Sequence, residues 1–232
     1  MIKAVVTPPR VPRGCVVQVC FHGVGEPKRP LEDGESAYWI RRDRFLKLLD
    51  TIGSWPDVRL SFDDGNASDE EIVLPALRER GLTATFFVLA GRLGQPGSLD
   101  ETGLGRLQDA GMRIGSHGWR HEPWTGLNKA EMARELHEAR VRIAAATGYD
   151  VRSAALPLGR YDRAVLAALK KAGYSSVATS DRRLSAEGSW LQHRFSATAT
   201  DTPGVLKQTV EEAAKPMNRL AAKARGLVKR WR

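Results

Sequence analysis

The chain has 232 residues, of which 42% are hydrophobic and 27% are charged, a composition that excludes a disordered or fibrous protein and predicts a globular one. No apolar stretch approaches the roughly 18 residues of a transmembrane helix, and the first residues do not resemble a secretion signal, so we expect a cytoplasmic protein. Of the net charge of +9, residues 215–232 supply seven basic residues and no acidic one. A charge confined to one end does not indicate a nucleic-acid groove, and we expect no nucleic-acid partner.

Short apolar runs alternate with helical patterns along the chain. The runs predict strands at residues 16–21, 58–62, 84–89, 112–116, 151–156, 175–179 and 190–196. The helical patterns predict helices at residues 42–52, 69–80, 99–110, 129–147 and 163–172. The predicted N-cap residues are Ser68, Ser98, Asn128 and Asp162. This alternation predicts an α/β fold with a parallel sheet, closed or nearly closed into a barrel, with an open doubly wound sheet as the alternative.

We expect the barrel to occupy residues 1–204 and a basic helical tail to occupy residues 205–232. The tail carries an apolar stripe at helical spacing, formed by Met217, Leu220, Ala221, Ala224, Leu227, Val228 and Trp231. One interpretation is a helix in peripheral contact with an anionic membrane, at its inner face. The other, which we favour, is a terminal helix that packs its apolar stripe on the barrel. The sequence leaves the oligomeric state open.

The chain is organised around two carboxylates at the end of a predicted strand. The apolar run at residues 58–62 is followed directly by Asp63, Asp64 and Gly65. Folds of this class keep their active sites at the carboxyl ends of strands. Adjacent carboxylates repel each other, so both stay ionised only beside a positive charge, most often a metal ion.

A histidine and a long loop follow the first predicted strand. His22 ends the strand, and residues 23–39 form a loop of a length that is usually functional. The aromatic and acidic residues of this loop suit either a sugar-binding lip or a plain cap over the barrel. His22 would lie near the same mouth, either within the site or as a hydrogen-bonded structural residue.

Two further histidines follow another predicted strand. His117 comes directly after residues 112–116, and His121 follows four residues later. They can converge on one ion if the turn between them is helix-like, and imidazole suits zinc and its first-row neighbours. Such a pair alone is a weak signal, whereas the pair combined with Asp63 and Asp64 at two strand ends of one barrel is much stronger.

The two motifs, SFDDG at residues 61–65 and SHGWRH at residues 116–121, resemble the first two motifs of the polysaccharide deacetylase family, the NodB-homology or carbohydrate esterase 4 group. The resemblance implies a distorted (β/α)7 TIM-like barrel. It also implies that Asp64, His117 and His121 hold Zn²⁺, or another divalent first-row ion such as Co²⁺ or Ni²⁺. Asp63 would be the general base, and His193, in the sequence LQH, would be the general acid or else a structural residue. We expect substrate contacts from His22, Trp119, Pro157 and Leu158.

The later motifs depart from the family pattern. In the third motif, Ala155 replaces the arginine that usually orients the base, and Arg160 is a hypothetical substitute from the next turn. In the fifth motif, Arg194 stands where an aspartate is expected. Asp181 belongs to the stretch that could match the fourth motif, and the residues between Asp181 and His193 are too few for the helix that normally lies there. The pattern indicates a shortened branch of the family.

The expected function is metal-dependent removal of an N-acetyl group from an amino sugar, in a cytoplasmic precursor of a surface polysaccharide or glycolipid. One alternative is hydrolysis of a non-sugar amide, which a small closed pocket would favour over an open aromatic groove. A second is a catalytically inactive carbohydrate-binding protein on the same barrel, which the missing arginine at Ala155 suggests.

Overall fold

The computed structural model describes residues 7–231, without the side chains of residues 223, 225 and 227–231. Within this part of the chain one sheet contains β1 (Cys15–Phe21), β2 (Val58–Asp64), β3 (Ala84–Val88), β4 (Arg113–Ser116), β5 (Ser153–Ala155), β6 (Ser176–Thr179), β7 (Ser185–Ala186), β8 (Leu191–His193) and β9 (Phe195–Ser196). The strand order is β7-β1-β2-β3-β4-β5-β6-β8, with β9 also paired to β1. Every pair is parallel except β1 with β7.

One segment joins the two ends of the sheet into a nearly closed barrel. β8 pairs with β6, and after a break at Arg194 the chain continues as β9, which pairs with β1. The predicted strand at residues 190–196 is therefore two short strands that serve different neighbours. The α/β barrel expected from the sequence is confirmed, and the open sheet is excluded.

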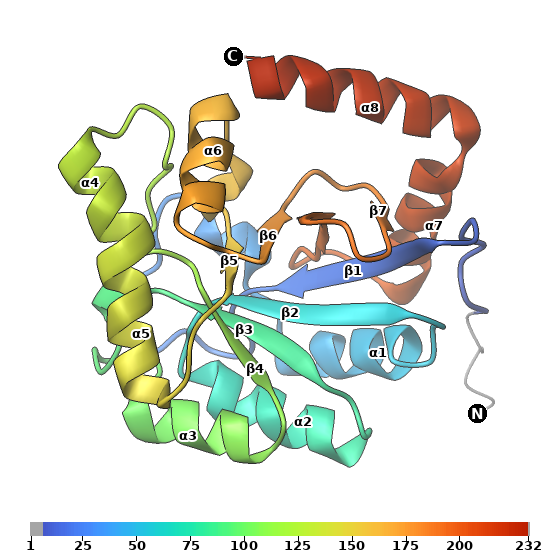
Figure 1. Ribbon diagram of the computed structural model, residues 1–232. Coiled ribbons are helices and arrows are strands. Elements are labelled where there is room, and N and C mark those ends of the chain that lie inside the picture. The colour runs from blue at the N-terminus through green and yellow to red at the C-terminus, as the bar shows by residue number, and fades with distance from the viewer. Residues whose placement is uncertain (1–6, 232) are drawn as a thin grey trace.

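The helices lie outside the sheet (Figure 1). They are α1 (Arg42–Ile52), α2 (Leu74–Glu79), α3 (Glu101–Asp109), α4 (Lys129–Ala133), α5 (Ala139–Thr147), α6 (Arg163–Lys171), α7 (Pro203–Ala214) and α8 (Pro216–Trp231). Two of the predicted helices contain a π-helical turn: Asp69–Val73 precedes α2, and Arg134–Glu138 joins α4 to α5. Such a turn changes the hydrogen-bond pattern by one residue, which hydrophobic spacing does not reveal.

Local side chains cap several of these helices. Asn128 forms a capping box with α4, and Asp162 accepts a hydrogen bond from the first turn of α6, as predicted. At α3 the N-cap is Asp100 rather than Ser98. Ser68 does not cap its helix, because its hydroxyl accepts a hydrogen bond from the backbone of the loop after β1.

The alternation of side chains along β2 directs one set of residues to the helices and the other into the barrel. Phe62 stacks on Phe21 and Phe86 of the neighbouring strands, with ring centroids 5.4 and 5.0 Å apart. Phe62 also meets the edge of Phe45 in α1, so this side of β2 faces the outer core. Ser61 and Asp63 lie on the other side and face the interior.

The tail differs from the interpretation favoured above. In α8, Met217 is 78% and Leu220 is 66% exposed, whereas Gly226 is buried beside Arg183. The described part of the apolar stripe therefore faces away from the barrel, and the docking prediction is wrong for these residues. The stripe side chains that lie outside the described residues are Leu227, Val228 and Trp231. Within residues 7–231, no helix is long and apolar enough to cross a membrane.

Candidate functional site

Asp63 and Asp64 end β2, and both are almost completely buried. Adjacent residues of a regular strand point to opposite faces, yet these two line one cavity. Asp64 breaks the alternation because its φ is 79°, in the left-handed region, and Gly65 follows with φ 69°. For a residue with a Cβ this conformation costs on the order of 1–3 kcal/mol, and such strain is typical of functional sites. A Cβ on Gly65 would lie 3.0 Å from a methyl carbon of Val88, so glycine fits this turn best.

The cavity that contains the carboxylates has a volume of about 230 Å³ and lies at the carboxyl ends of the strands. Its lining residues come from the ends of β1, β2, β5 and β6, from β9, from the loop that follows β4 and from the loop before α1. They are His22, Glu32, Asp33, Gly34, Glu35, Tyr38, Asp63, Asp64, His117, His121, Leu156, Leu158, Ser180 and Ser196. The fold thus brings together residues that are far apart in the sequence.

Asp63 forms a buried, two-pronged ion pair with Arg194. The two guanidinium Nη atoms donate to the two carboxylate oxygens, each at 2.7 Å. Arg194 is 1% exposed, and it also donates to the Ser61 hydroxyl and to the backbone oxygen of Thr179. Burial alone would raise the pKa of Asp63, but Arg194 and, to a smaller extent, His117 hold it well below its ordinary value. Asp63 is therefore ionised and fixed in orientation.

Asp64, His117 and His121 form a group that could hold a metal ion. One ligand atom from each of the three lies within 4.8 Å of the others. The Nε2 atoms of His117 and His121 are 3.5 and 3.6 Å from the same oxygen of Asp64. Both oxygens of Asp64 are buried and lack a hydrogen-bond partner among the described residues. A buried carboxylate without donors is costly unless a cation compensates it, so the donor set fits a divalent ion.

Each of the two imidazoles is oriented through its other nitrogen. Nδ1 of His117 lies 2.9 Å from the backbone oxygen of Ala155, and Nδ1 of His121 lies 2.5 Å from a carboxylate oxygen of Glu32. Hydrogens on the Nδ1 atoms would leave both Nε2 lone pairs directed at Asp64. Burial lowers the pKa of His117 to about 4, against the opposing effect of the two aspartates, so this imidazole is neutral at pH 7, as a metal ligand must be.

His22 lies on another wall of the same cavity. Its ring centroid is 5.0 Å from that of Tyr38, and ligand atoms of His22, Cys20 and Asp63 lie within 4.8 Å of one another. Its Nδ1 is buried without a hydrogen-bond partner within residues 7–231. Burial would raise the pKa of Asp64, but three surrounding histidines, with His22 first, hold it below its ordinary value. His22 is thus part of the site rather than a remote structural residue.

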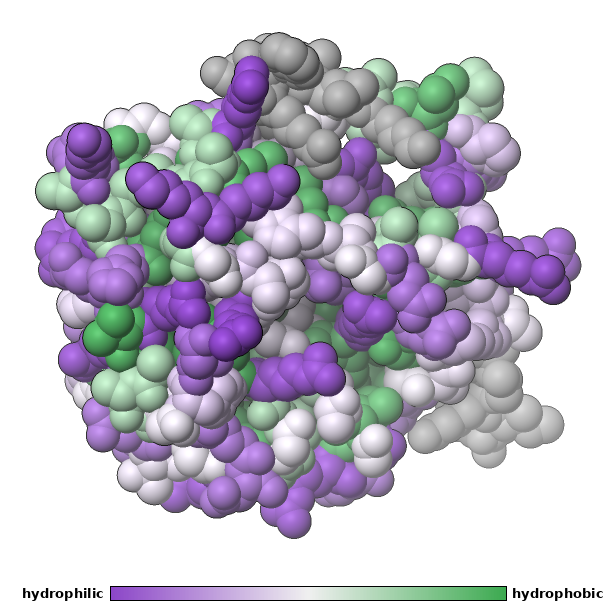
Figure 2. All heavy atoms as spheres, viewed as in Figure 1, coloured by the Kyte–Doolittle hydropathy of each residue, from purple (hydrophilic) through white to green (hydrophobic). Residues whose placement is uncertain are grey.

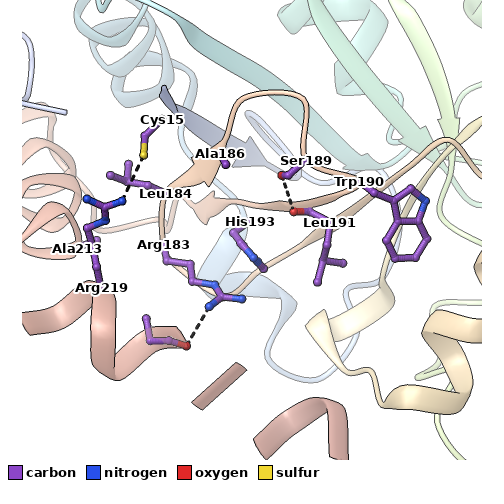
Figure 3. Close-up of a pocket in the computed structure, with 11 residues that line it drawn as sticks. Cys15, Arg183, Leu184, Ala186, Ser189, Trp190, Leu191, His193, Ala213 and Arg219 are labelled. Carbon is purple, nitrogen blue, oxygen red and sulfur yellow. Dashed lines mark hydrogen bonds between the residues drawn. The ribbon is translucent and has the colours of Figure 1, made fainter. Parts of the chain in front are cut away.

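The predicted general acid does not reach this cavity. His193 is on β8 between Gln192 and Arg194, which face the barrel interior, so its side chain points to the outside of the barrel. Nδ1 of His193 lies 3.0 Å from the Thr179 hydroxyl and 3.1 Å from a carboxylate oxygen of Asp181. Figure 3 shows His193 in a different cavity, near Arg183 and Leu191. This placement corrects the assignment of His193 to the catalytic centre.

The predicted substrate contacts divide into two groups. His22 and Leu158 line the cavity, and Leu158 has φ 53° and is 56% exposed. Pro157 is buried beside Leu158 but does not line the cavity. Trp119 is also absent from the lining, because its ring is covered by arginines of the neighbouring helices and packs against Gly91.

Sequence reasoning missed two residues of the site. The exposed Arg160 was the hypothetical partner of Asp63, whereas both oxygens of Asp63 are bound by Arg194. In the sequence, Arg194 stands out only as a departure from the family pattern, and Glu32 only as one of the acidic residues of the loop after the first strand. No local signal in the sequence connects either residue to its partner.

Comparisons with known proteins agree with this geometry. A family model described as polysaccharide deacetylase matches residues 53–177. YxkH of Bacillus subtilis (strain 168), a protein ascribed to the polysaccharide deacetylases, is 25% identical over 139 residues, which are 59% of this chain and 50% of YxkH. The chain therefore spans about half the length of this curated relative.

Solved structures share the fold at low sequence identity. The Streptococcus pyogenes deacetylase PplD, in complex with acetate, has a TM-score of 0.73 at 18% identity, over 85% of this chain and 98% of PplD. IcaB from Ammonifex degensii has a TM-score of 0.68 at 20% identity, over 85% of this chain and 97% of IcaB. At such identities the likeness establishes the barrel, and the activity has to be argued from the site.

Proposed function

Because the chain belongs to the polysaccharide deacetylase family, we propose that it removes an N-acetyl group from an amino sugar by metal-dependent hydrolysis. The observation that carries the proposal is the oriented carboxylate of Asp63 beside the Asp64–His117–His121 group in one cavity. The expected substrate is a cytoplasmic precursor of a surface polysaccharide or glycolipid. A cavity of about 230 Å³ suits one acetamido sugar unit, because sites for larger ligands usually measure about 300–1,000 Å³.

Asp64, His117 and His121 would hold the ion, with Zn²⁺, Co²⁺ or Ni²⁺ as candidates. When bound there, the ion would polarise the acetyl carbonyl and make a water molecule more acidic. Glu32 keeps the His121 ring in the orientation that this binding requires. The acidic side chains on the cavity wall also suit the cationic amine that deacetylation produces.

Asp63 would take the proton of the attacking water. Arg194 keeps the carboxylate ionised and holds its two oxygens in a fixed plane. The same pairing makes Asp63 a weak base, so it would hold the proton only briefly during the attack. The backbone N–H of Leu158, on the cavity wall, is our candidate for a donor to the oxygen that becomes negative in the transition state.

His22 is our candidate for the general acid in place of His193. When the C–N bond breaks, the leaving amine must receive a proton, and an imidazole can donate one near neutral pH. His22 lines the cavity and lies beside Asp63, whereas His193 faces the outside of the barrel. A proton donor has to reach the departing nitrogen, and a residue that lines the cavity can do so.

The cavity size favours one alternative function and Arg194 weakens another. A small cavity also suits a compact amide without a sugar ring, so hydrolysis of such an amide is the second candidate. The inactive-binder interpretation depended on the missing arginine at position 155. Arg194 supplies a guanidinium to Asp63 from the break between β8 and β9, which removes that reason.

Acetate release tests the proposal. The protein would be assayed with each candidate metal on free, nucleotide-linked and lipid-linked N-acetylated amino sugars, and on simple acetamides. We expect release from an amino sugar, reduced at least about 100-fold in Asp63→Asn with metal binding retained, and unchanged in the surface control Asp109→Asn. Release from acetamides alone would favour the second candidate. Equal release by wild type and Asp63→Asn would contradict the proposed role of Asp63.

A further inference from the structure

α8 presents apolar side chains to solvent. Met217 and Leu220 are the two most exposed large hydrophobic side chains in the described part of the chain, at 78% and 66%. Ala221 and Ala224 are exposed too. In Figure 2, apolar spheres cover the first turns of α8 at the upper right, beside hydrophilic ones. An exposed apolar face on a helix is a typical interaction surface.

The opposite face of α8 is attached to the barrel by polar and backbone contacts. Arg183 donates to the backbone oxygen of Ala222 at 2.9 Å, and Arg219 lies 3.7 Å from the sulfur of Cys15. A Cβ on Gly226 would lie 2.9 Å from the Arg183 guanidinium, so the helix approaches this side chain closely. A cavity of about 490 Å³ remains between α8 and β7–β8 (Figure 3). Met217 and Leu220 are on the exposed face of α8 and do not contribute to the core.

The charge of this segment selects the partner. Residues 215–232 carry seven basic residues and no acidic one. Two copies of the chain that met through α8 would bring these like charges together, which disfavours self-association. An anionic lipid surface instead offers negative headgroups to the basic residues and an apolar layer to the stripe.

We propose that α8 binds the surface of anionic membranes, lying in the plane of the interface with Met217 and Leu220 inserted below the headgroups. The contact is peripheral, since no helix in residues 7–231 can cross a bilayer. Binding depends on both the basic residues and the apolar stripe, because attraction to the headgroups and burial of apolar area add to each other. The proposal does not depend on the deacetylase activity, so either can fail without the other.

Co-sedimentation with vesicles tests the proposal. The full chain would be mixed with vesicles of phosphatidylcholine alone and of phosphatidylcholine with 30 mol% phosphatidylglycerol. The test variant is Met217→Ser with Leu220→Ser, and the matched control is Val141→Ser, an apolar residue on α5 that is 54% exposed. Thermal unfolding of all three proteins would show that both variants are folded.

We expect the wild type and Val141→Ser to bind the anionic vesicles, with little binding to neutral vesicles or at 0.5 M salt. The double variant should bind the anionic vesicles at least about tenfold more weakly, because it removes two side chains that would be buried in the membrane. Equal binding by wild type and double variant, or no binding to anionic vesicles, would overturn the proposal. Dimerisation lost in the double variant, without vesicle binding, would assign the stripe to a second copy instead.

Discussion

The ion pair between Asp63 and Arg194 gives the sharpest prediction. Replacing Arg194 with methionine keeps most of the side-chain volume but leaves the carboxylate of Asp63, which is 2% exposed, without its cation. Removal of one partner from a buried pair typically costs about 3–5 kcal/mol of unfolding free energy, compared with about 0–1 kcal/mol for a surface pair. Because the two hydrogen bonds are 2.7 Å long and both groups are buried, we expect the larger cost.

The pH dependence of the Arg194→Met variant should change sign. In the wild type the pKa of Asp63 lies below the unfolded value of about 3.9, so the pair contributes stability above that pH and loses it as the pH falls through the lowered pKa. In the variant, burial is no longer opposed by Arg194, and the pKa should lie above 3.9. The stability of the variant should then decrease as the pH rises from about 4 through the raised pKa. The loss of unfolding free energy relative to the wild type should therefore be larger at pH 8 than at pH 5.

Urea unfolding at pH 5 and pH 8 would measure both effects. The double variant Asp63→Asn/Arg194→Met should lose less unfolding free energy than the sum of the losses in the two single variants. The difference, the interaction energy, should be about 2 kcal/mol. Arg160→Met is the matched control, because Arg160 is exposed and should change stability by no more than about 0.5 kcal/mol. A cost below about 1 kcal/mol for Arg194→Met, with no pH dependence, would refute the assignment of a buried pair.

Three further changes test other parts of the site. Glu32→Gln should weaken Zn²⁺ binding about 10–100-fold in a metal titration, because His121 loses its charged partner, and unchanged affinity would contradict this. His22→Gln should lower kcat for acetate release by about 10²–10⁴-fold with metal affinity retained. If kcat falls in His193→Gln and not in His22→Gln, His193 is the general acid instead. Gly65→Ala should lower the unfolding free energy by about 1–3 kcal/mol in urea, since φ is 69° and Val88 lies close, and full stability would show that the turn tolerates a Cβ.

The candidate metal ligands were predictable from sequence because their signals are local. Asp64, His117 and His121 lie within five residues of the ends of two predicted strands, and the carboxyl ends of parallel strands meet at one edge of a barrel. The partner of Asp63 was not predictable in this way, because Arg194 is 131 positions away. Its position depends on the break between β8 and β9, which the apolar run at residues 190–196 does not reveal.

The error for His193 has a different origin. The sequence of a strand shows that alternate residues face opposite sides of the sheet, but not which set faces the barrel interior. In this strand Gln192 and Arg194 face the interior, so His193 faces outward. The tail gave a similar result, because helical spacing predicts an apolar stripe but not the direction in which it faces. In α8 the small residues Ala222 and Gly226 lie toward the barrel, and Met217 points to solvent.

Titration of the metal-stripped protein with Zn²⁺ tests the central claim most directly. We expect one ion per chain, with binding lost in Asp64→Asn and in His121→Ala and retained in His137→Ala, an exposed histidine outside the cavity. Loss in the first two variants alone would place the ion between the carboxylate and the imidazoles at the carboxyl ends of β2 and β4. Absence of binding by the wild type, or equal binding by Asp64→Asn, would contradict the metal site and the hydrolytic mechanism built on it.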